Sequence, residues 1–221
     1  MNKNIVITGA NRGIGLSLTQ HYQQQGHQVY AACRHGSSEL NASGATIIDG
    51  IDVADDHSIA QLATELNSTK IDLLINNAGI LRNESLGDID YEAIQTQFTV
   101  NALGPLKVTE ALRNHFADNA KLAMITSRMG SIEDNTSGGR YGYRMSKAAL
   151  NCAAMSLTHD LKPKGVAVGI IHPGLVGTEM IGGHGDITPD QAAERIAQRI
   201  EQLNLENSGT FWHSSGEVLP W

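Results

Sequence analysis

A tyrosine and a lysine stand four residues apart in the stretch RYGYRMSK, at Tyr143 and Lys147. Positions four apart lie on one face of a helix, so a helix here would place the phenol beside the ammonium group. The ordinary pKa of tyrosine is about 10, and a neighbouring positive charge lowers it by stabilising the phenolate. Such a pair can exchange a proton with a substrate near neutral pH. Tyr141 stands six residues before the lysine and is expected to precede the first full turn, so the spacing selects Tyr143.

Other polar residues could complete a proton-transfer site. Ser127 follows the apolar run LAMIT, and Ser131 offers a second hydroxyl in the same loop, where serine also serves ordinary turns. Asn101 lies in the apolar stretch FTVNALGPL. Its amide could have a function, or it could simply be a polar residue of a helix interior. A YxxxK spacing is common by chance, so residue types alone leave these alternatives open.

A glycine-rich turn, TGANRGIG at 8–15, lies between an apolar run and an amphipathic segment. Gly9, Gly13 and Gly15 would let the backbone approach a diphosphate, and a helix N-terminus supplies free N–H groups with a partial positive charge. The spacing is GxxxGxG rather than GxGxxG, and a glycine-rich turn can also be purely structural. Its position between a strand and a helix favours dinucleotide binding.

The second apolar run ends YAACRH, where an NAD site would carry an acid for the ribose 2′-hydroxyl. Cys33 occupies that place, and Arg34 follows it. Arg34 and Arg12 could both pair with a 2′-phosphate, although each could also be a solvated surface residue. Asp52 could accept a hydrogen bond from the adenine amino group or act as a cap. The missing acid and the two arginines together favour NADP(H) over NAD(H).

The elements that must position these residues follow from the hydropathy pattern. Short apolar runs without polar alternation predict strands buried on both faces, and the longer segments between them predict helical crossovers. We expect strands at 5–8, 28–33, 45–49, 73–76, 122–126, 166–171 and 210–213. We expect helices at 14–25, 57–66, 91–116, 143–161 and 189–203. No linker or repeat divides the chain, so we predict an α/β fold: one domain over residues 1–221, with a Rossmann-type doubly wound parallel sheet of about seven strands and helices on both faces.

The composition disfavours several classes of protein. The chain of 221 residues is long enough to bury a core without disulfides or a metal. A net charge of −7 without a basic cluster argues against nucleic acid as a partner. The two cysteines, Cys33 and Cys152, have no metal-type spacing and suggest a reducing compartment. No stretch is long enough to span a membrane, and the N-terminal apolar run is too short for a secretory signal, so we expect a cytoplasmic protein.

Six motifs occur in a fixed order: TGANRGIG at 8–15, NNAG at 76–79, Asn101, Ser127, YRMSK at 143–147 and PGLVGT at 173–178. From residue 3 to about 178 this set resembles the short-chain dehydrogenase/reductase family, in its compact NAD(P)-dependent branch. The resemblance implies that Tyr143 protonates a carbonyl oxygen as hydride arrives from the nicotinamide, and that Ser127 holds that oxygen. Lys147 would lower the tyrosine pKa and bind the nicotinamide ribose, and Asn101 would anchor a water that relays protons. Ser127 is favoured over Ser131 because it ends a strand and has glycine three places on, as the family pattern requires.

The resemblance also implies the residues that hold the cofactor. The segment 77–79 would line a ribose, and Thr178 would bond the carboxamide. The full cofactor set is Gly9, Asn11, Arg12, Gly13, Ile14, Gly15, Arg34, Asp52, Val53, Asn77, Ala78, Gly79, Tyr143, Lys147, Pro173, Gly174, Val176 and Thr178. No metal ligand is implied.

The chain departs from the family pattern in one loop. Ser127 and Tyr143 are 16 residues apart, a few more than is usual, and the extra residues near EDNTSGG should form a distinctive wall of the substrate pocket. This loop, the CR pair after the second strand and the ending GTFWHSSGEVLPW resemble the sniffer and C-factor group. A short glycine-rich lid is expected at about 179–188, with Met180, Ile181 and His184 as candidates for substrate contact or for ordinary loop packing. Thr188 is expected to cap the next helix, and Trp212 and Trp221 to flank a hairpin that turns at SSG.

The resemblance implies an NADPH-dependent oxidoreductase that reduces an aldehyde or ketone to an alcohol. The alternative is a regulatory or signalling protein that binds NAD(P)H on the same fold with vestigial catalysis. Small residues along the catalytic helix, Ala148, Ala149, Ala153 and Ala154, would permit close packing between copies. We therefore expect a homodimer or homotetramer that acts on a small molecule.

Overall fold

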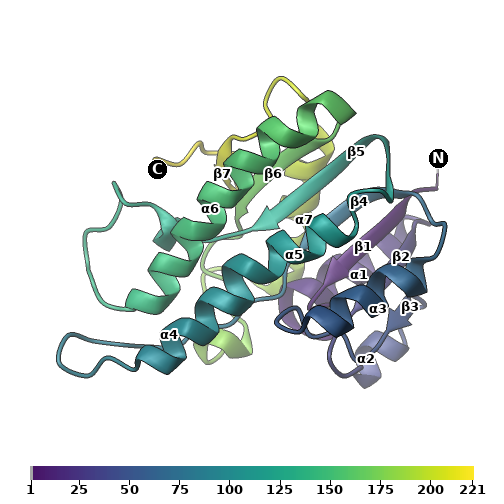
Figure 1. Ribbon diagram of the computed structural model, residues 1–221. Coiled ribbons are helices and arrows are strands. Elements are labelled where there is room, and N and C mark those ends of the chain that lie inside the picture. Colours follow the sequence, from purple (N-terminus) through teal and green to yellow (C-terminus); the bar gives the residue numbers. More distant parts are fainter. Residues whose placement is uncertain (1) are drawn as a thin grey trace.

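The computed structural model describes residues 2–221, and those residues form one sheet of seven parallel strands (Figure 1). The strands are β1 (Asn4–Thr8), β2 (Gln28–Ala32), β3 (Thr46–Ile48), β4 (Ile71–Asn76), β5 (Phe116–Ile125), β6 (Ala167–His172) and β7 (Phe211–His213). Their order is β3-β2-β1-β4-β5-β6-β7, so the direction of winding reverses between β1 and β4. The predicted doubly wound sheet is confirmed.

Helices cover both faces of this sheet (Figure 1). The helices are α1 (Gly13–Gln24), α2 (Ser38–Asn41), α3 (Asp56–Leu66), α4 (Tyr91–Phe98), α5 (Gly104–Ala111), α6 (Tyr141–Leu161) and α7 (Pro189–Gln202). Shorter turns are the π-turn η1 (Thr99–Leu103) and the 3-10 turns η2 (Arg128–Gly130), η3 (Lys162–Lys164) and η4 (Glu179–Ile181). Apolar residues of α3, α5 and α6 pack on one face, and those of α1, α2 and α7 pack on the other.

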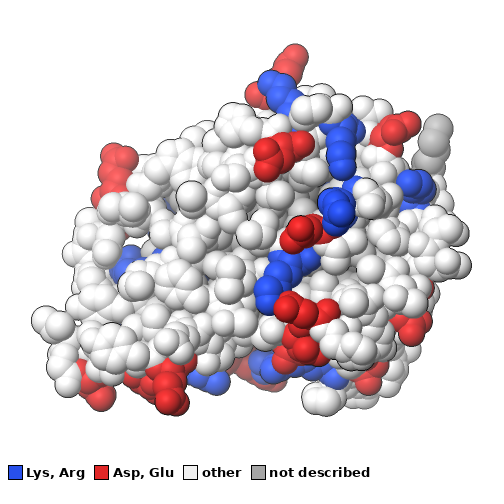
Figure 2. Space-filling view, viewed as in Figure 1, with Lys and Arg blue, Asp and Glu red and all other residues white. Residues whose placement is uncertain are grey.

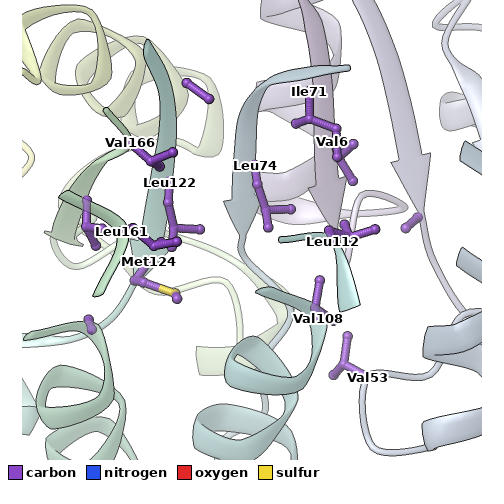
Figure 3. Close-up of a cluster of buried hydrophobic side chains, with 14 of the residues drawn as sticks. Val6, Val53, Ile71, Leu74, Val108, Leu112, Leu122, Met124, Leu161 and Val166 are labelled. Atoms are coloured by element: carbon purple, nitrogen blue, oxygen red, sulfur yellow. The ribbon is translucent and has the colours of Figure 1, made fainter. Parts of the chain in front are cut away.

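The apolar runs supply the core because the central strands are buried on both faces. Figure 3 shows Val6, Leu74 and Leu122 of neighbouring strands within one cluster, together with Val108. All four side chains are fully buried. Fully burying an aliphatic side chain stabilises the fold by about 1.5–3 kcal/mol. Because these strands are buried on both faces, they carry apolar residues at successive positions and do not alternate with polar ones. The sheet is thus a firm base for the loops at its carboxyl edge.

Two element boundaries differ from the sequence prediction. The helix predicted at 91–116 ends at Ala111 and contains the π-turn, and Phe116 already belongs to β5. Phe116 pairs with Ile71, and the register then shifts before Leu73 pairs with Lys121. This irregular start of β5 has a polar sequence, ADNA, which gives no strand pattern. The short helix α2 was not predicted, because four residues carry no periodicity; Ser37 caps it by accepting from the Leu40 N–H at 3.1 Å.

The C-terminal segment folds back as predicted. Trp212 bridges Val218 in antiparallel fashion, and Trp221 stacks on Phe211 with ring centroids 5.4 Å apart. The Trp221 carbonyl accepts from the N–H of Glu133, so this hairpin supports the loop that precedes α6. Thr188 caps α7 in a reciprocal capping box, as expected. Between residues 2 and 221, no helix combines the length and the hydropathy that a membrane crossing requires.

Candidate active site

A cavity of about 670 Å³ opens at the carboxyl ends of the strands, where the winding reverses between β1 and β4. Ligands of open α/β sheets bind at such a point. Most predicted cofactor residues line it: Gly9, Asn11, Arg12, Gly13, Ile14, Arg34, Asp52, Val53, Asn77, Ala78, Gly79, Tyr143, Lys147, Pro173 and Thr178. The other predicted residues stand outside that lining: Gly15, Asn101, Ser127, Gly174 and Val176.

The loop between β1 and α1 requires glycine for close packing. Gly9 has a φ of +65°, and a Cβ atom there would lie 2.9 Å from the Cα atom of Ala78. A Cβ atom at Gly15 would lie 2.2 Å from the Gly9 carbonyl oxygen and 2.6 Å from Asn77 Nδ2. The Asn77 amide in turn donates to the carbonyls of Thr8 and Gly9, both at 3.1 Å. The loop is therefore tied to the end of β4, and Gly15 acts through this packing rather than as part of the lining.

Tyr143 and Lys147 lie on one face of α6, as their spacing predicts. Lys147 Nζ stands 5.9 Å from the centroid of the Tyr143 ring and donates to the Ile125 carbonyl at 2.9 Å. Only 9% of Tyr143 and 4% of Lys147 is exposed to solvent. Tyr141 is the first residue of α6, rather than a residue that precedes the helix. The phenol that faces the cavity is therefore that of Tyr143.

Burial governs the protonation of both groups. Desolvation lowers the pKa of Lys147 to about 8. Desolvation also raises the pKa of Tyr143, while the Ser127 hydroxyl and the Arg140 charge act in the opposite direction. The predicted lowering of the tyrosine pKa by Lys147 is not found in this structure, because burial of a phenolate outweighs the stabilisation from its neighbours. The resting phenol is protonated near neutral pH.

The structure separates the two candidate serines. Ser127 begins η2 beside the Tyr143 phenol, and its Oγ accepts from the Met129 N–H at 3.1 Å. Ser131 is buried, and its Oγ accepts from the Asp134 N–H at 3.0 Å, which is ordinary turn chemistry. Gly130 permits η2 to pack on α6, since a Cβ atom there would lie 2.8 Å from the carbonyl carbon of Lys147. This close packing sets Ser127 next to the phenol.

Asn101 lies in the π-turn and joins three segments. Its Oδ1 accepts from the Ile80 N–H at 2.8 Å, and its Nδ2 donates to the Ile80 carbonyl at 2.8 Å and to Ser146 Oγ at 3.0 Å. Both amide protons are therefore in use, and the side chain is fully buried. A Cβ atom on Gly79 would lie 3.2 Å from Asn101 Oδ1 and 3.7 Å from Lys147 Nζ, so the three groups adjoin. The side-chain NH₂ group therefore has no proton left to donate to a water.

A buried polar cluster below the start of α6 was not predicted. The Glu84 carboxylate, 5% exposed, accepts from the Gly142 N–H at 3.2 Å and from the Gln97 side chain. Gln97 Oε1 accepts from the Arg82 N–H at 2.8 Å. A Cβ atom at Gly142 would lie 2.4 Å from Gln97 Nε2, so any larger residue between the two tyrosines of RYGYRMSK would press on this cluster. The signal in the sequence was that glycine, which stands one residue before Tyr143.

The predicted arginines of the ribose end occupy different surroundings. Arg34 is exposed and lines the cavity. Arg12 also lines it, but its guanidinium is paired with Glu179, an acid that the sequence reasoning did not single out. Asp52 borders the cavity, and its Oδ1 accepts from the Ala54 N–H at 2.9 Å within its own turn. Buried Cys33 donates to Asp49 Oδ1 at 3.8 Å, so a carboxylate that directly follows β3 does stand near the position where an NAD site carries its acid.

The segment after β6 closes one side of the cavity. Met180 of η4 reaches the lining, whereas Ile181 and His184 do not. Gly174 has a φ of +97°, and a Cβ atom there would lie 3.4 Å from His213 Nε2. Val176 is buried and bridges Ile187, so it shapes the segment from behind.

Two histidines stand behind Pro173 and were also missed. The rings of His172 and His213 meet edge to face, with centroids 5.1 Å apart. The Nδ1 atom of His172 is buried without a hydrogen-bond partner among residues 2–221. Burial lowers the pKa of His172 to about 3, with the positive neighbours adding to the effect. His172 is therefore a neutral residue packed against His213.

Comparison with known proteins identifies a family for this chain. The family model of the short chain dehydrogenases matches residues 3–202. A 1-hydroxy-2-glutathionyl-2-methyl-3-butene dehydrogenase of Rhodococcus sp. (strain AD45) is 40% identical over 223 residues, which cover 98% of this chain and 99% of the relative. The C-signal protein of Myxococcus xanthus is 43% identical over 162 residues, which cover 72% of this chain and 98% of the relative.

Two solved structures superpose on the whole chain. An NADPH-bound carbonyl reductase from chicken fatty liver gives a TM-score of 0.91 at 28% identity, with 100% of this chain and 99% of that chain covered. The carbonyl reductase Sniffer of D. melanogaster gives a TM-score of 0.91 at 26% identity, with full coverage of both chains.

Proposed function

The chain belongs to the short-chain dehydrogenase family, of the sniffer and C-factor type, and from that premise we propose that it reduces an aldehyde or ketone to an alcohol with NADPH. The observation that carries the proposal is the buried Tyr143 phenol, which faces the cavity beside Ser127 with Lys147 on the same helix face. Reduction needs a proton donor, and burial raises the pKa of this phenol and keeps it protonated. The site is therefore suited to the reductive direction.

The residues present fit a dinucleotide. The cavity runs from the β1–α1 loop to Tyr143, and the close packing of Gly9 and Gly15 leaves the backbone bare where a diphosphate would approach α1. Bound NADPH supplies the hydride. In this proposal, Gly13, Asn11 and Ile14 hold the diphosphate, and Arg34 with Arg12 hold the 2′-phosphate. The remaining contacts are assigned to Asp52 and Val53 for adenine, to Asn77, Ala78, Gly79 and Lys147 for the riboses, and to Pro173, Gly174, Val176 and Thr178 for the nicotinamide end.

Residues of the chain then transfer one proton to the substrate. Ser127 Oγ donates to the substrate carbonyl oxygen and fixes it near the phenol. Tyr143 Oη gives its proton to that oxygen as the carbon accepts hydride, so an alcohol forms and a phenolate remains. The Lys147 ammonium stabilises this phenolate, and Asn101 supports the reprotonation path from its π-turn, a local form of helix that is frequent at functional sites.

A matched pair of variants tests this mechanism. Tyr143→Phe removes the proton donor and should abolish NADPH oxidation across a panel of aldehydes and ketones. Tyr141→Phe removes a phenol from the first residue of the same helix and should leave the rate within a small factor of wild type. Equal activity of the two variants would refute the assignment of Tyr143.

The cofactor preference is tested separately. If Arg34 and Arg12 hold the 2′-phosphate, kcat/KM with NADPH should exceed that with NADH by at least tenfold, or roughly 1.4 kcal/mol. Arg34→Ser should reduce this ratio through the NADPH value alone. The carboxylate of Asp49 lies near this position and would favour NADH over NADPH. Equal use of the two cofactors would indicate that Asp49, and not the arginines, contacts the ribose.

A second candidate function comes from the relatives. The C-signal likeness favours an NAD(P)H-binding signalling protein with weak catalysis, and the name of the Rhodococcus relative describes a dehydrogenase of a hydroxylated glutathionyl compound. Tight NADPH binding without turnover on a broad panel would support the signalling role. Turnover of an alcohol that bears a glutathionyl group would support the dehydrogenase role.

The proposed enzyme acts as a homodimer or homotetramer in the cytoplasm. On α6, Met145 is 47% exposed, and Cys152 is exposed on the same helix. Leu103, the last residue of the π-turn, is 46% exposed. Analytical ultracentrifugation of the purified protein would measure the number of subunits.

A further inference from the structure

Arg140 stands at the entrance to α6 in a backbone conformation that arginine rarely adopts. Its φ and ψ are +50° and +46°, and it follows Gly138 and Gly139, both with a φ of +64°. A left-handed conformation costs a residue with a Cβ atom about 1–2 kcal/mol. Such strain persists only where the surroundings hold it, and it gathers at active sites and ligand clamps. Here the Arg140 N–H donates to the Glu84 carbonyl at 2.8 Å, and the Arg144 N–H donates to the Arg140 carbonyl at 2.9 Å.

The side chain of Arg140 reaches toward the catalytic residues. The residue is exposed, and its Nη1 atom lies 3.8 Å from Met129 Sδ. Met129 follows Ser127 by two residues in η2, and Tyr143 follows Arg140 by three residues in α6. The guanidinium charge is close enough to the Tyr143 phenol to stabilise its ionised form. It therefore lies beside η2, near the start of α6 and outside the lining of the cofactor cavity.

The Arg140 guanidinium also lacks an acidic partner. In the described chain, ion pairs join Arg12 to Glu179, Lys107 to Asp56, and Arg128 to Asp134 and Glu217, and Arg140 belongs to the larger group of cations without such a pair. Figure 2 shows Lys and Arg side chains interspersed with Asp and Glu over one face of the molecule. Within residues 2–221, no carboxylate lies within 4.0 Å of Arg140, and the one hydrogen-bond partner of its side chain is a thioether, which is a weak acceptor.

We propose that Arg140 binds a carboxylate carried by the substrate, so that the enzyme acts on anionic carbonyl compounds. The proposal rests on the proposed function, because it assigns the substrate class of the same site. A guanidinium presents a planar fork of N–H donors that matches a carboxylate bidentately. Its fixed place beside Ser127 and Tyr143 would hold the substrate by its anionic end while the carbonyl group meets the phenol. A chain with a net charge of −7 would otherwise repel such a substrate.

The test compares substrates that differ only in charge. The probes are ortho-, meta- and para-carboxybenzaldehyde and their methyl esters, each assayed with NADPH. The proteins are wild type, Arg140→Gln, Arg140→Lys and Arg140→Gly, and the matched control is Arg144→Gln. Arg144 stands one helical turn away and is bound to the Gly138 carbonyl and to Ser137 Oγ.

For wild type we expect at least one acid to exceed its ester in kcat/KM by tenfold or more. Arg140→Gln should remove that ratio through the acid alone, with the esters within about threefold of wild type, and Arg140→Lys should retain part of it. Arg140→Gly relieves the backbone strain, so it should lose the selectivity while its melting temperature does not fall. Arg144→Gln should keep the ratio.

Two results would overturn the proposal. One is an equal loss for acids and esters in Arg140→Gln, which would make Arg140 a structural residue. The other is a wild-type enzyme that reduces esters at least as well as acids. If wild type reduces none of these compounds or any other carbonyl, the proposed function itself fails, which is a separate outcome.

Discussion

Replacement of Glu84 by glutamine should destabilise the fold and misplace the catalytic helix, although Glu84 touches no reacting group. The carboxylate accepts from the Gly142 N–H and from the Gln97 side chain, one hydrogen bond on each oxygen. A glutamine has only one acceptor oxygen, so its NH₂ group would face another donor. A hydrogen bond to a charged group contributes about 1.5–3 kcal/mol. The lost charge at the N-terminus of α6 adds about 0.3–1 kcal/mol.

Together these effects predict that Glu84→Gln lowers the free energy of unfolding by about 2–4 kcal/mol. For a protein of this size, 1 kcal/mol corresponds to about 2–4 °C in melting temperature, so a fall of about 5–15 °C is expected. The assay is thermal unfolding followed by circular dichroism, with kcat/KM measured well below the transition.

The matched control is Glu92→Gln, which removes an exposed glutamate from the first turn of α4. It should change the melting temperature by no more than about 2 °C. If Glu84→Gln had the same melting temperature as this control, the buried carboxylate would not hold the start of α6, and the explanation of how Tyr143 is positioned would be wrong.

Three further predictions follow from single contacts. Gly142→Ala should lower stability by about 1–3 kcal/mol in urea unfolding, because its Cβ atom would lie 2.4 Å from Gln97 Nε2; unchanged stability would show that the cluster can move aside. Glu179→Gln frees Arg12 and should lower the Kd for NADPH by up to about fivefold without changing the Kd for NADH, since exposed ion pairs contribute at most about 1 kcal/mol. His172 has a folded-state pKa of about 3, below its unfolded value of 6.5, so stability is complete above pH 6.5 and is lost as the pH falls. At pH 5 the free energy of unfolding should be lower by about 2 kcal/mol. Urea titrations should show no such loss for His172→Asn and the full loss for the exposed control His184→Asn.

The sequence was informative where the signal is local. The spacing of Tyr143 and Lys147 fixes their shared helix face without reference to any other element, and the apolar runs without alternation predict a buried parallel sheet. Ser127 could be chosen over Ser131 only by likeness to a family, because the choice depends on the approach of η2 to α6. That approach depends on Gly130, whose role is visible only when the two elements are packed.

The missed residues act between segments that are distant in the chain. Glu84 caps a helix that begins 57 residues later, at Tyr141, and neither stretch has a pattern that names the other. The pairing of Arg12 with Glu179 likewise joins residues 167 positions apart. The predicted lowering of the Tyr143 pKa was not found for a related reason. Proximity to Lys147 is a local property of the sequence, whereas desolvation depends on every segment that packs around the phenol.

The junction at Asn101 has a consequence for how the enzyme would respond to alkali. An amide has no proton to lose in the accessible range, so the tie between the π-turn, Ile80 and Ser146 keeps the same donors and acceptors as the solution becomes basic. The groups that do titrate there, Lys147 and Tyr143, are held on a frame that does not titrate with them. The alkaline limb of a rate profile would therefore report the chemistry of the proton donor, free of any loosening of the frame that carries it.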